Sequence, residues 1–183
     1  MNAIDLILAK IKNYPKGCIF AIDGPSGAGK TTLAAQLSKV IDCNIIHTDD
    51  FFLQEGQEMP LLDINLDTIR LEKEVLSKLN AYAPITYNKY NCATGKFTPV
   101  AITPKSITII EGCYSTSPNL SQYYNFFVFI DITRKIQLER IKNRDSNKYE
   151  RFVSEWIPLE DKYFGRYELR NESKKEPNLL INL

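Results

Sequence analysis

Residues 18–40 read CIFAIDGPSGAGKTTLAAQLSKV, and this stretch decides the fold. It opens with an apolar run that has the length of a strand and stops at a glycine-rich segment. From residue 31 onward the apolar side chains return at helical spacing. The stretch is therefore a strand, a loop and a helix, in that order.

The loop, residues 24–31, matches G-x-x-x-x-G-K-[ST] in the strand-to-helix setting that this motif requires. Its glycines let successive N–H groups point inward, and the following helix adds its positive end. A nucleoside triphosphate suits such a site, with Lys30 at the β- and γ-phosphates and the Thr31 hydroxyl on Mg²⁺. The alternative is a glycine-rich turn that only caps a helix. We therefore predict ATP and Mg²⁺ as cofactors, with ATP bound by Gly24, Pro25, Ser26, Gly27, Ala28, Gly29, Lys30, Thr31 and Thr32.

Similar apolar runs recur along the chain, and helical patterns separate them. Continuous runs of this kind are typical of parallel strands that are covered on both faces. The length of 183 residues, with 44% hydrophobic residues, suits one domain, residues 1–183. We expect further strands at residues 44–48, 106–112, 126–132 and 178–182, and helices at residues 66–79 and 133–143.

The bulk composition restricts location and partners. A net charge of +1 provides no electrostatic case for a nucleic-acid or acidic-membrane partner. The four cysteines are far apart and form no C-x-x-C pair, which favours free thiols and a cytoplasmic location. Residues 1–16 are expected to hold a short amphipathic helix, too polar for a signal sequence and too short to span a bilayer. A homo-oligomer is left open.

Other classes of phosphate-loop protein fit less well. A GTPase reads guanine with N-K-x-D, whereas the nearest string here, NKYN at residues 88–91, lacks the aspartate. A DNA-handling ATPase is usually longer or more basic. The chain has the size of one small-molecule kinase domain, so the partner that we expect is a small phosphoryl acceptor.

The string HTDDFF, residues 47–52, follows the second expected strand. Asp49 falls at the carboxyl end of that strand, where ligands bind in open parallel sheets, and it could deprotonate an acceptor hydroxyl. Its alternative role is to cap a turn. Asp50 could assist with Mg²⁺ or cap the next turn, and Phe51 could wall the acceptor pocket or pack beneath it. We interpret His47 as strand packing, because one histidine without a second His or Cys nearby is a poor metal site.

Two further features complete the predicted catalytic set. Glu111 ends a buried strand at the same edge of the sheet and could hold Mg²⁺ directly or through water. Arg140 and Arg144 are four residues apart on a helix, where they could stabilise the transferring phosphoryl group or simply form a solvated face.

Residues of about 140–151 could form a lid that excludes water from the site. The aromatic stripe in EWIPLEDKYF, residues 155–164, is interpreted as core packing.

The strings IDGPSGAGKTTLA, HTDDFF, NLDTIRLEKEVL, YNKYNC, IIEGCYS, RIKNRD and FVSEWIPLEDKYF occur in the order seen in the uridine kinase-like family. The resemblance covers nearly the whole chain from about residue 18. It implies a three-layer P-loop NTPase fold with a five-stranded parallel sheet and a small lid, ATP with Mg²⁺ as donor, and Asp49 as the base. It also implies that acceptor-binding residues follow HTDDFF, and the matching candidates are Asp67, Arg70, Tyr87 and Tyr90.

We therefore expect an ATP-dependent phosphotransferase that acts on a hydroxyl of a small molecule, with uridine or a related nucleoside as the favoured acceptor. Nicotinamide riboside kinases carry the D-D-F-F form of the string at residues 49–52, so nicotinamide riboside or a non-nucleoside alcohol is the first alternative. A regulatory module that binds ATP without transferring phosphate is the second alternative. Its expected mark is a broken catalytic set.

Overall fold

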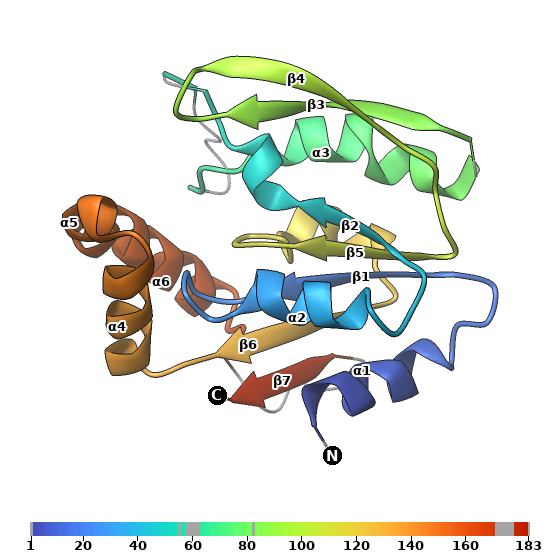
Figure 1. Cartoon of the computed structure of the whole chain (residues 1–183), viewed down its shortest axis with the longest axis horizontal. Coiled ribbons are helices and arrows are strands. Elements are labelled where there is room, and N and C mark those ends of the chain that lie inside the picture. The colour runs from blue at the N-terminus through green and yellow to red at the C-terminus, as the bar shows by residue number, and fades with distance from the viewer. Residues whose placement is uncertain (1, 55, 58–62, 82, 171–177, 183) are drawn as a thin grey trace.

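The computed structural model describes residues 2–54, 56–57, 63–81, 83–170 and 178–182. Its centre is a five-stranded sheet in the order β2-β5-β1-β6-β7, and every pairing in it is parallel (Figure 1). The predicted five-stranded parallel sheet is confirmed, and each expected strand falls within one or two residues of the observed one. The strands are β1 (Cys18–Asp23), β2 (Asn44–His47), β5 (Ile107–Glu111), β6 (Phe126–Asp131) and β7 (Leu179–Asn182).

Helices cover both faces of the sheet, which gives the predicted three layers (Figure 1). On one face the β1 side chains Phe20 and Ile22 pack with helices α1 and α2, and on the other face Ile110 and Phe129 pack with α6. Burial of this apolar surface provides the main driving force for the fold. The α-helices are α1 (Ala3–Ile11), α2 (Lys30–Leu37), α3 (Thr68–Glu74), α4 (Arg134–Arg144), α5 (Tyr149–Arg151) and α6 (Ile157–Arg166). No helix in the described ranges is long and apolar enough to cross a membrane.

Shorter helical turns link these elements. The expected helix at residues 66–79 is divided, because α3 ends at Glu74 and a 3₁₀ segment follows it. Within residues 145–151, expected to belong to a lid, residues 146–151 are helical and lead through a π-helical turn into α6. The 3₁₀ segments are η1 (Thr48–Phe51), η2 (Leu76–Ala81), η3 (Pro118–Tyr123) and η4 (Ser146–Lys148), and the π segment is η5 (Phe152–Trp156).

An antiparallel hairpin of β3 (Ile85–Asn91) and β4 (Lys96–Ile102) stands beside the main sheet over α3 (Figure 1). This hairpin was not predicted from the sequence. β4 is largely exposed, and β3 buries only some of its side chains. Both strands therefore tolerate polar residues and lack the continuous apolar run of a buried strand. Residues of the hairpin line part of a large cavity that is described below.

The register of the sheet places several strand ends at one edge. His47 of β2 and Ile22 of β1 both lie opposite Glu111 of β5. In a parallel sheet this carboxyl edge is where ligands bind. The strand arrows in Figure 1 point toward the side on which α4, α5 and α6 stand.

Candidate active site

The phosphate loop connects β1 to α2, and its first residue packs directly on the sheet. Gly24 has a φ angle of 144°, and a Cβ atom there would lie 2.3 Å from the carbonyl oxygen of Ile130 in β6. Only glycine can therefore take this position without moving the strand. Gly29 ends the loop with a left-handed conformation at the N-cap of α2.

Lys30 begins α2, and its ammonium group lies back across the first residues of the loop. Nζ donates hydrogen bonds to the carbonyl oxygens of Gly24 and Pro25, at 2.7 and 3.0 Å, and the side chain is buried. Burial alone would lower the pKa of Lys30, but the neighbouring Cys113 and Glu160 raise it above its ordinary value. The lysine therefore carries its positive charge beside the loop at neutral pH.

Glu111 ends β5 next to the start of α2. The hydroxyl of Thr31 donates to Glu111 Oε1 at 3.1 Å, and the carboxylate is buried. The structure thus brings together two of the three residues that the sequence predicted at the Mg²⁺ site. They come from elements 80 residues apart in the chain.

The interpretation of His47 as strand packing is wrong. Its side chain is 41% exposed, and Nδ1 bonds to Oε1 of Glu111. This hydrogen bond raises the pKa of His47 above its ordinary value, against a smaller opposing effect of partial burial. The pairing of β2 with β5, which a single-strand pattern does not reveal, places the two residues opposite each other.

Asp49 lies in η1, directly after β2, and its carboxylate is exposed to the large cavity at this edge. The walls of the cavity remove part of its hydration and raise its pKa, and the neighbouring Glu111 raises it further. Lys30 acts in the opposite direction. The carboxylate is thus near the loop lysine and open to a ligand.

Asp50 is oriented differently, and its assignment as a metal ligand needs correction. Its side chain is buried, Oδ2 accepts a hydrogen bond from the hydroxyl of Tyr87 at 2.9 Å, and Oδ1 pairs with Nζ of Lys89 at 2.8 Å. Both oxygens are therefore engaged by the hairpin. Asp50 ties η1 to β3 rather than facing Glu111 and Thr31.

The six predicted acceptor-binding residues divide into two groups. Asp49 and Tyr90 line the large cavity. The other four are packed together behind it: the Phe51 and Tyr87 rings are 5.2 Å apart, and the Arg70 guanidinium lies 4.6 Å from the Phe51 ring centre. Asp67 caps α3 by accepting from the backbone N–H of Arg70 at 2.9 Å. In this structure the side chains that line the cavity do not include Phe51, Asp67, Arg70 or Tyr87.

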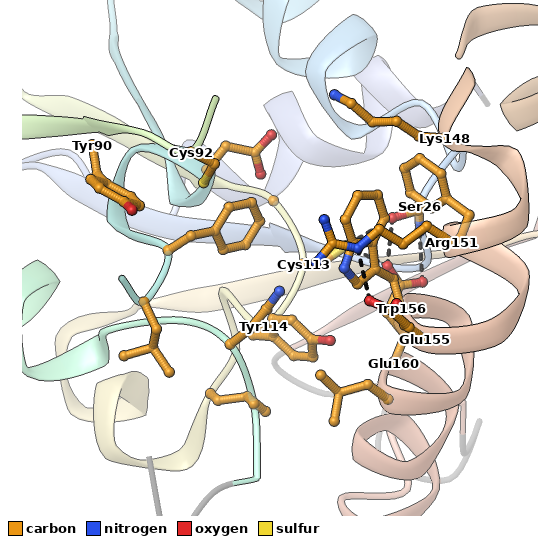
Figure 2. Close-up of a pocket in the computed structure, with 18 of the residues that line it drawn as sticks. Ser26, Tyr90, Cys92, Cys113, Tyr114, Lys148, Arg151, Glu155, Trp156 and Glu160 are labelled. Atoms are coloured by element: carbon orange, nitrogen blue, oxygen red, sulfur yellow. Dashed lines mark hydrogen bonds and ion pairs between the residues drawn. The ribbon is translucent and has the colours of Figure 1, made fainter. Parts of the chain in front are cut away.

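The large cavity has a volume of about 1410 Å³. Residues of the phosphate loop, Asp49 and Glu111 line it together with several aromatic side chains. In Figure 2, Tyr90 and Cys92 of the hairpin lie on one side, and Lys148 and Arg151 of the helical segment lie on the other. The aromatic lining residues are Phe52, Tyr90, Tyr114, Phe152 and Trp156.

A second cavity of about 720 Å³ also adjoins the loop. It extends along α2 and is lined by Ala3 of α1, Gln36 of α2 and Ile181 of β7. Arg144 lines both cavities, while Arg140 lines the second and donates to the carbonyl oxygen of Gly27 at 3.2 Å. The predicted arginine pair therefore lies beside the loop.

Glu160 was missed by the sequence analysis. It is buried on α6 and accepts hydrogen bonds from both the backbone N–H and the hydroxyl of Ser26. Its neighbours on the aromatic stripe have mixed roles, since Tyr163 is core while Trp156 lines the cavity. The sequence did contain a signal for Glu160, because it places a carboxylate among the apolar residues of the stripe. A carboxylate is rarely buried without a partner, so a specific partner could have been expected.

A Mg²⁺ site can be tested against these residues. No group of three or more His, Cys, Asp and Glu side chains within the described ranges is arranged to hold a metal ion. Mg²⁺ in phosphate-loop proteins does not require such a group, because substrate phosphates and waters complete its shell around one or two protein oxygens. The Thr31 hydroxyl and the Glu111 carboxylate provide two adjacent oxygen donors, and they fit that chemistry.

No protein-family model matches the chain. Among curated proteins, it is 27% identical over 175 residues to a uridine kinase of Borrelia duttonii, covering 89% of this chain and 85% of that protein. It is also 25% identical over 149 residues to a cytidylate kinase of Saccharolobus islandicus, covering 81% and 71% of the two chains.

Solved structures share the fold. A protein from Bacillus stearothermophilus described as a "Possible Uridine Kinase" superposes with a TM-score of 0.70 at 20% identity, covering 97% of this chain and 96% of the other. A candidate fructose transport system kinase from Silicibacter sp. TM1040 gives 0.60 at 18% identity, covering 80% and 83%.

The fold and the loop are those of phosphate-loop proteins, and the sequence relatives are named as kinases. In sequence the chain is similar to uridine kinases, and in fold it is similar to a protein described as a possible uridine kinase.

Proposed function

We propose that this kinase transfers the γ-phosphoryl group of ATP to a hydroxyl of a small molecule, with uridine or a related nucleoside as the favoured acceptor. The observation that carries the proposal is the position of Asp49. Its carboxylate is exposed to the large cavity, near the positive charge of Lys30 and beside Glu111. A base at this point can take the proton of an acceptor hydroxyl as it attacks the γ-phosphate.

The donor is assigned to the phosphate loop and the second cavity. The loop amides and the start of α2 attract the phosphates, and Lys30 can turn from its two carbonyl partners toward them. The second cavity, with Ala3, Gln36 and Ile181 on its walls, then receives the nucleoside part of ATP. Mg²⁺, when bound by Thr31 and Glu111, supplies positive charge at the β- and γ-phosphates.

Arg144 supports the transfer step by its position between the donor and acceptor cavities, since it lines both. Arg140 contacts the loop backbone. Guanidinium groups stabilise charge that spreads over phosphate oxygens during transfer. The helical segment of residues 146–151 serves as the lid, because Lys148 and Arg151 line the acceptor cavity from that side.

The acceptor is assigned to the space between Asp49 and the hairpin. Phe52, Tyr90 and Tyr114 offer aromatic faces on which a base or another flat ring can stack. Asp67, Arg70 and Tyr87 then act by holding this wall in place. Nicotinamide riboside fits the same description and stays an alternative.

A phosphorylated acceptor is a second candidate, and the position of Arg144 favours it. Arg144, Lys148 and Arg151 all line the acceptor side, and a cytidylate kinase is among the sequence relatives. The phosphate of a nucleoside monophosphate could bind Arg144 and replace the carboxylates of Asp145 and Glu155, which pair with Lys148 and Arg151.

A panel of acceptors with coupled ADP detection tests these assignments. The panel contains uridine, cytidine, nicotinamide riboside, their monophosphates and a non-nucleoside alcohol. We expect the highest kcat/KM on a pyrimidine nucleoside, and failure on every nucleoside and nucleotide would reject the proposed acceptor class.

The same assay tests the base. Asp49→Asn keeps the shape of the side chain but cannot accept the proton, so kcat should fall by about 10²-fold or more. Asp42→Asn is the matched control, because Asp42 lies at the surface, paired with Lys105. Unchanged turnover in Asp49→Asn would remove Asp49 from the mechanism.

A further inference from the structure

Glu160 is a buried carboxylate whose hydrogen-bond partners belong mainly to the phosphate loop and its surroundings. Only 3% of the residue is exposed. It accepts from the backbone N–H of Ser26 at 3.0 Å and also from the Ser26 hydroxyl. The thiol of Cys113 and the amide of Gln137 complete its contacts, at 3.3 and 3.5 Å. Figure 2 shows Ser26, Cys113 and Glu160 grouped at the same wall of the cavity.

A charge in this position requires compensation. An isolated buried carboxylate is strongly unfavourable unless it is paired or hydrogen-bonded. The compensation comes from the loop: two donors of Ser26, together with the nearby ammonium of Lys30, whose pKa Glu160 helps to raise. The carboxylate is thus part of the electrostatic surroundings of the loop.

Glu160 also fixes the position of the loop relative to α6. Ser26 is the third residue of the phosphate motif, and Glu160 holds both its backbone and its side chain. On its other side Glu160 meets Gln137 of α4, the helix that also carries Arg140 and Arg144. One side chain therefore links the loop to the two helices beside it.

We propose that Glu160 is a positioning residue that holds Ser26 and, through it, keeps the phosphate loop in the form that binds the ATP phosphates. This inference rests on the proposed function, because it concerns the donor side of that same reaction. Glu160 itself does not contact the reacting atoms. Its removal is expected to affect ATP and to leave the acceptor largely unaffected.

A positioning role predicts that loss of the Glu160 carboxylate weakens ATP binding, whereas simple charge repulsion predicts that it tightens ATP binding. A carboxylate near the loop repels a triphosphate, so its neutralisation by Glu160→Gln should tighten ATP binding if repulsion dominates. If positioning dominates, the amide loses charge-assisted hydrogen bonds to Ser26 and the loop relaxes. The direction of the change in ATP affinity separates the two.

The experiment compares the full chain with Glu160→Gln, Ser26→Ala and the double variant. Binding of a fluorescent ATP analogue with Mg²⁺ is measured together with KM for ATP and for the best acceptor. We expect Glu160→Gln to weaken ATP binding about tenfold, because neutral hydrogen bonds replace charge-assisted ones. The acceptor KM should change less than about twofold. Asp161→Asn, one residue further along α6 and paired at the surface with Arg134, is the matched control.

The double variant tests whether the effect passes through Ser26. Its loss of ATP affinity should be smaller than the product of the two single losses, because both substitutions remove the same contact. Tighter or unchanged ATP binding in Glu160→Gln overturns the inference, as does an effect on the acceptor KM alone. If Glu160→Gln does not fold, Glu160→Asp decides, because it keeps the charge but shortens the side chain that reaches Ser26: a loss of ATP affinity of about threefold or more supports the inference, and unchanged affinity overturns it. No ATP binding by the unaltered protein overturns the proposed function as well.

Discussion

At the scale of single residues, Asp49 and Asp50 are neighbours in the chain with opposite surroundings. Asp49 faces the large cavity, whereas Asp50 is buried between Tyr87 and Lys89. A 3₁₀ turn separates adjacent side chains by about 120°, so one points to solvent while the next points to the hairpin. The two carboxylates therefore have different tasks, and only Asp49 is available to a ligand.

The raised pKa of Asp49 predicts a cost to stability. Desolvation by the cavity walls and the proximity of Glu111 make its ionised form less favourable in the folded protein than in the unfolded chain. Asp49→Asn should therefore raise the free energy of unfolding at neutral pH, and by a small amount, because water still reaches the side chain. Urea denaturation of both proteins measures the difference.

The sign of this effect depends on pH. A group with a raised pKa favours folding most below its ordinary value, here 3.8, and loses that contribution as the pH rises through its folded pKa. The advantage of Asp49→Asn should thus be full at neutral pH, shrink as the pH falls through the raised folded pKa, and be nearly lost below pH 3.8. Asp42→Asn is again the surface control, and an advantage that grows as the pH falls would contradict the assignment.

At the scale of elements, the hairpin is held to the rest of the protein by Arg70. Its guanidinium lies 4.6 Å from the ring centre of Phe51 and 5.3 Å from that of Phe97, and it donates to the backbone oxygens of Asp50 and Asn88. These contacts join α3, η1 and both strands of the hairpin. Arg70, which the resemblance implied as an acceptor-binding residue, does not line the cavity.

Arg70→Ala should therefore lower the free energy of unfolding by about 1–3 kcal/mol, since it removes ring stacking and two hydrogen bonds together. Arg70→Lys should recover little of the loss, because a lysine lacks the planar fork. Urea denaturation gives the values, with Lys73→Ala as the exposed control on the same helix. Equal stability of Arg70→Ala and Lys73→Ala would show that the hairpin is held by other contacts.

At the scale of the whole molecule, two cavities meet at the phosphate loop. One is walled by the hairpin and the helical segment of residues 146–151, and the other by α1, α2 and β7. The loop, Lys30 and Arg144 belong to both. This arrangement suits a reaction in which a group passes from one ligand to another.

ATP with Mg²⁺ should therefore stabilise the whole chain against heat. A ligand at 100 times its Kd adds about 2.7 kcal/mol, which for a chain of this size corresponds to a rise in Tm of about 5–10 °C. Lys30→Ala should lose most of this rise, and a chelator of Mg²⁺ should reduce it in the unaltered protein. Differential scanning fluorimetry provides the measurement, with Lys39→Ala, an exposed residue beyond the end of α2, as the control. A full shift in Lys30→Ala would show that the triphosphate binds elsewhere.

Much of the fold could be predicted because its signals are local. The strand-loop-helix order and the apolar runs depend on neighbours in the chain, and they located all five strands of the sheet. The hairpin escaped prediction because its side chains alternate only partly and its outer strand is exposed. The lid remains a prediction, and the observed helices at residues 146–151 show only where it would start.

The sequence by itself determined the phosphate loop, the edge of the sheet at which it lies, and the presence there of Asp49 and Glu111. Motif spacing and strand length suffice for this, since parallel strands share one carboxyl edge. Only the tertiary structure decided that Asp50 faces the hairpin, that His47 meets Glu111, and that Glu160 holds Ser26. Those contacts join residues 37 to 134 positions apart. Their formation depends on strand register and helix packing, which no local pattern in the chain records.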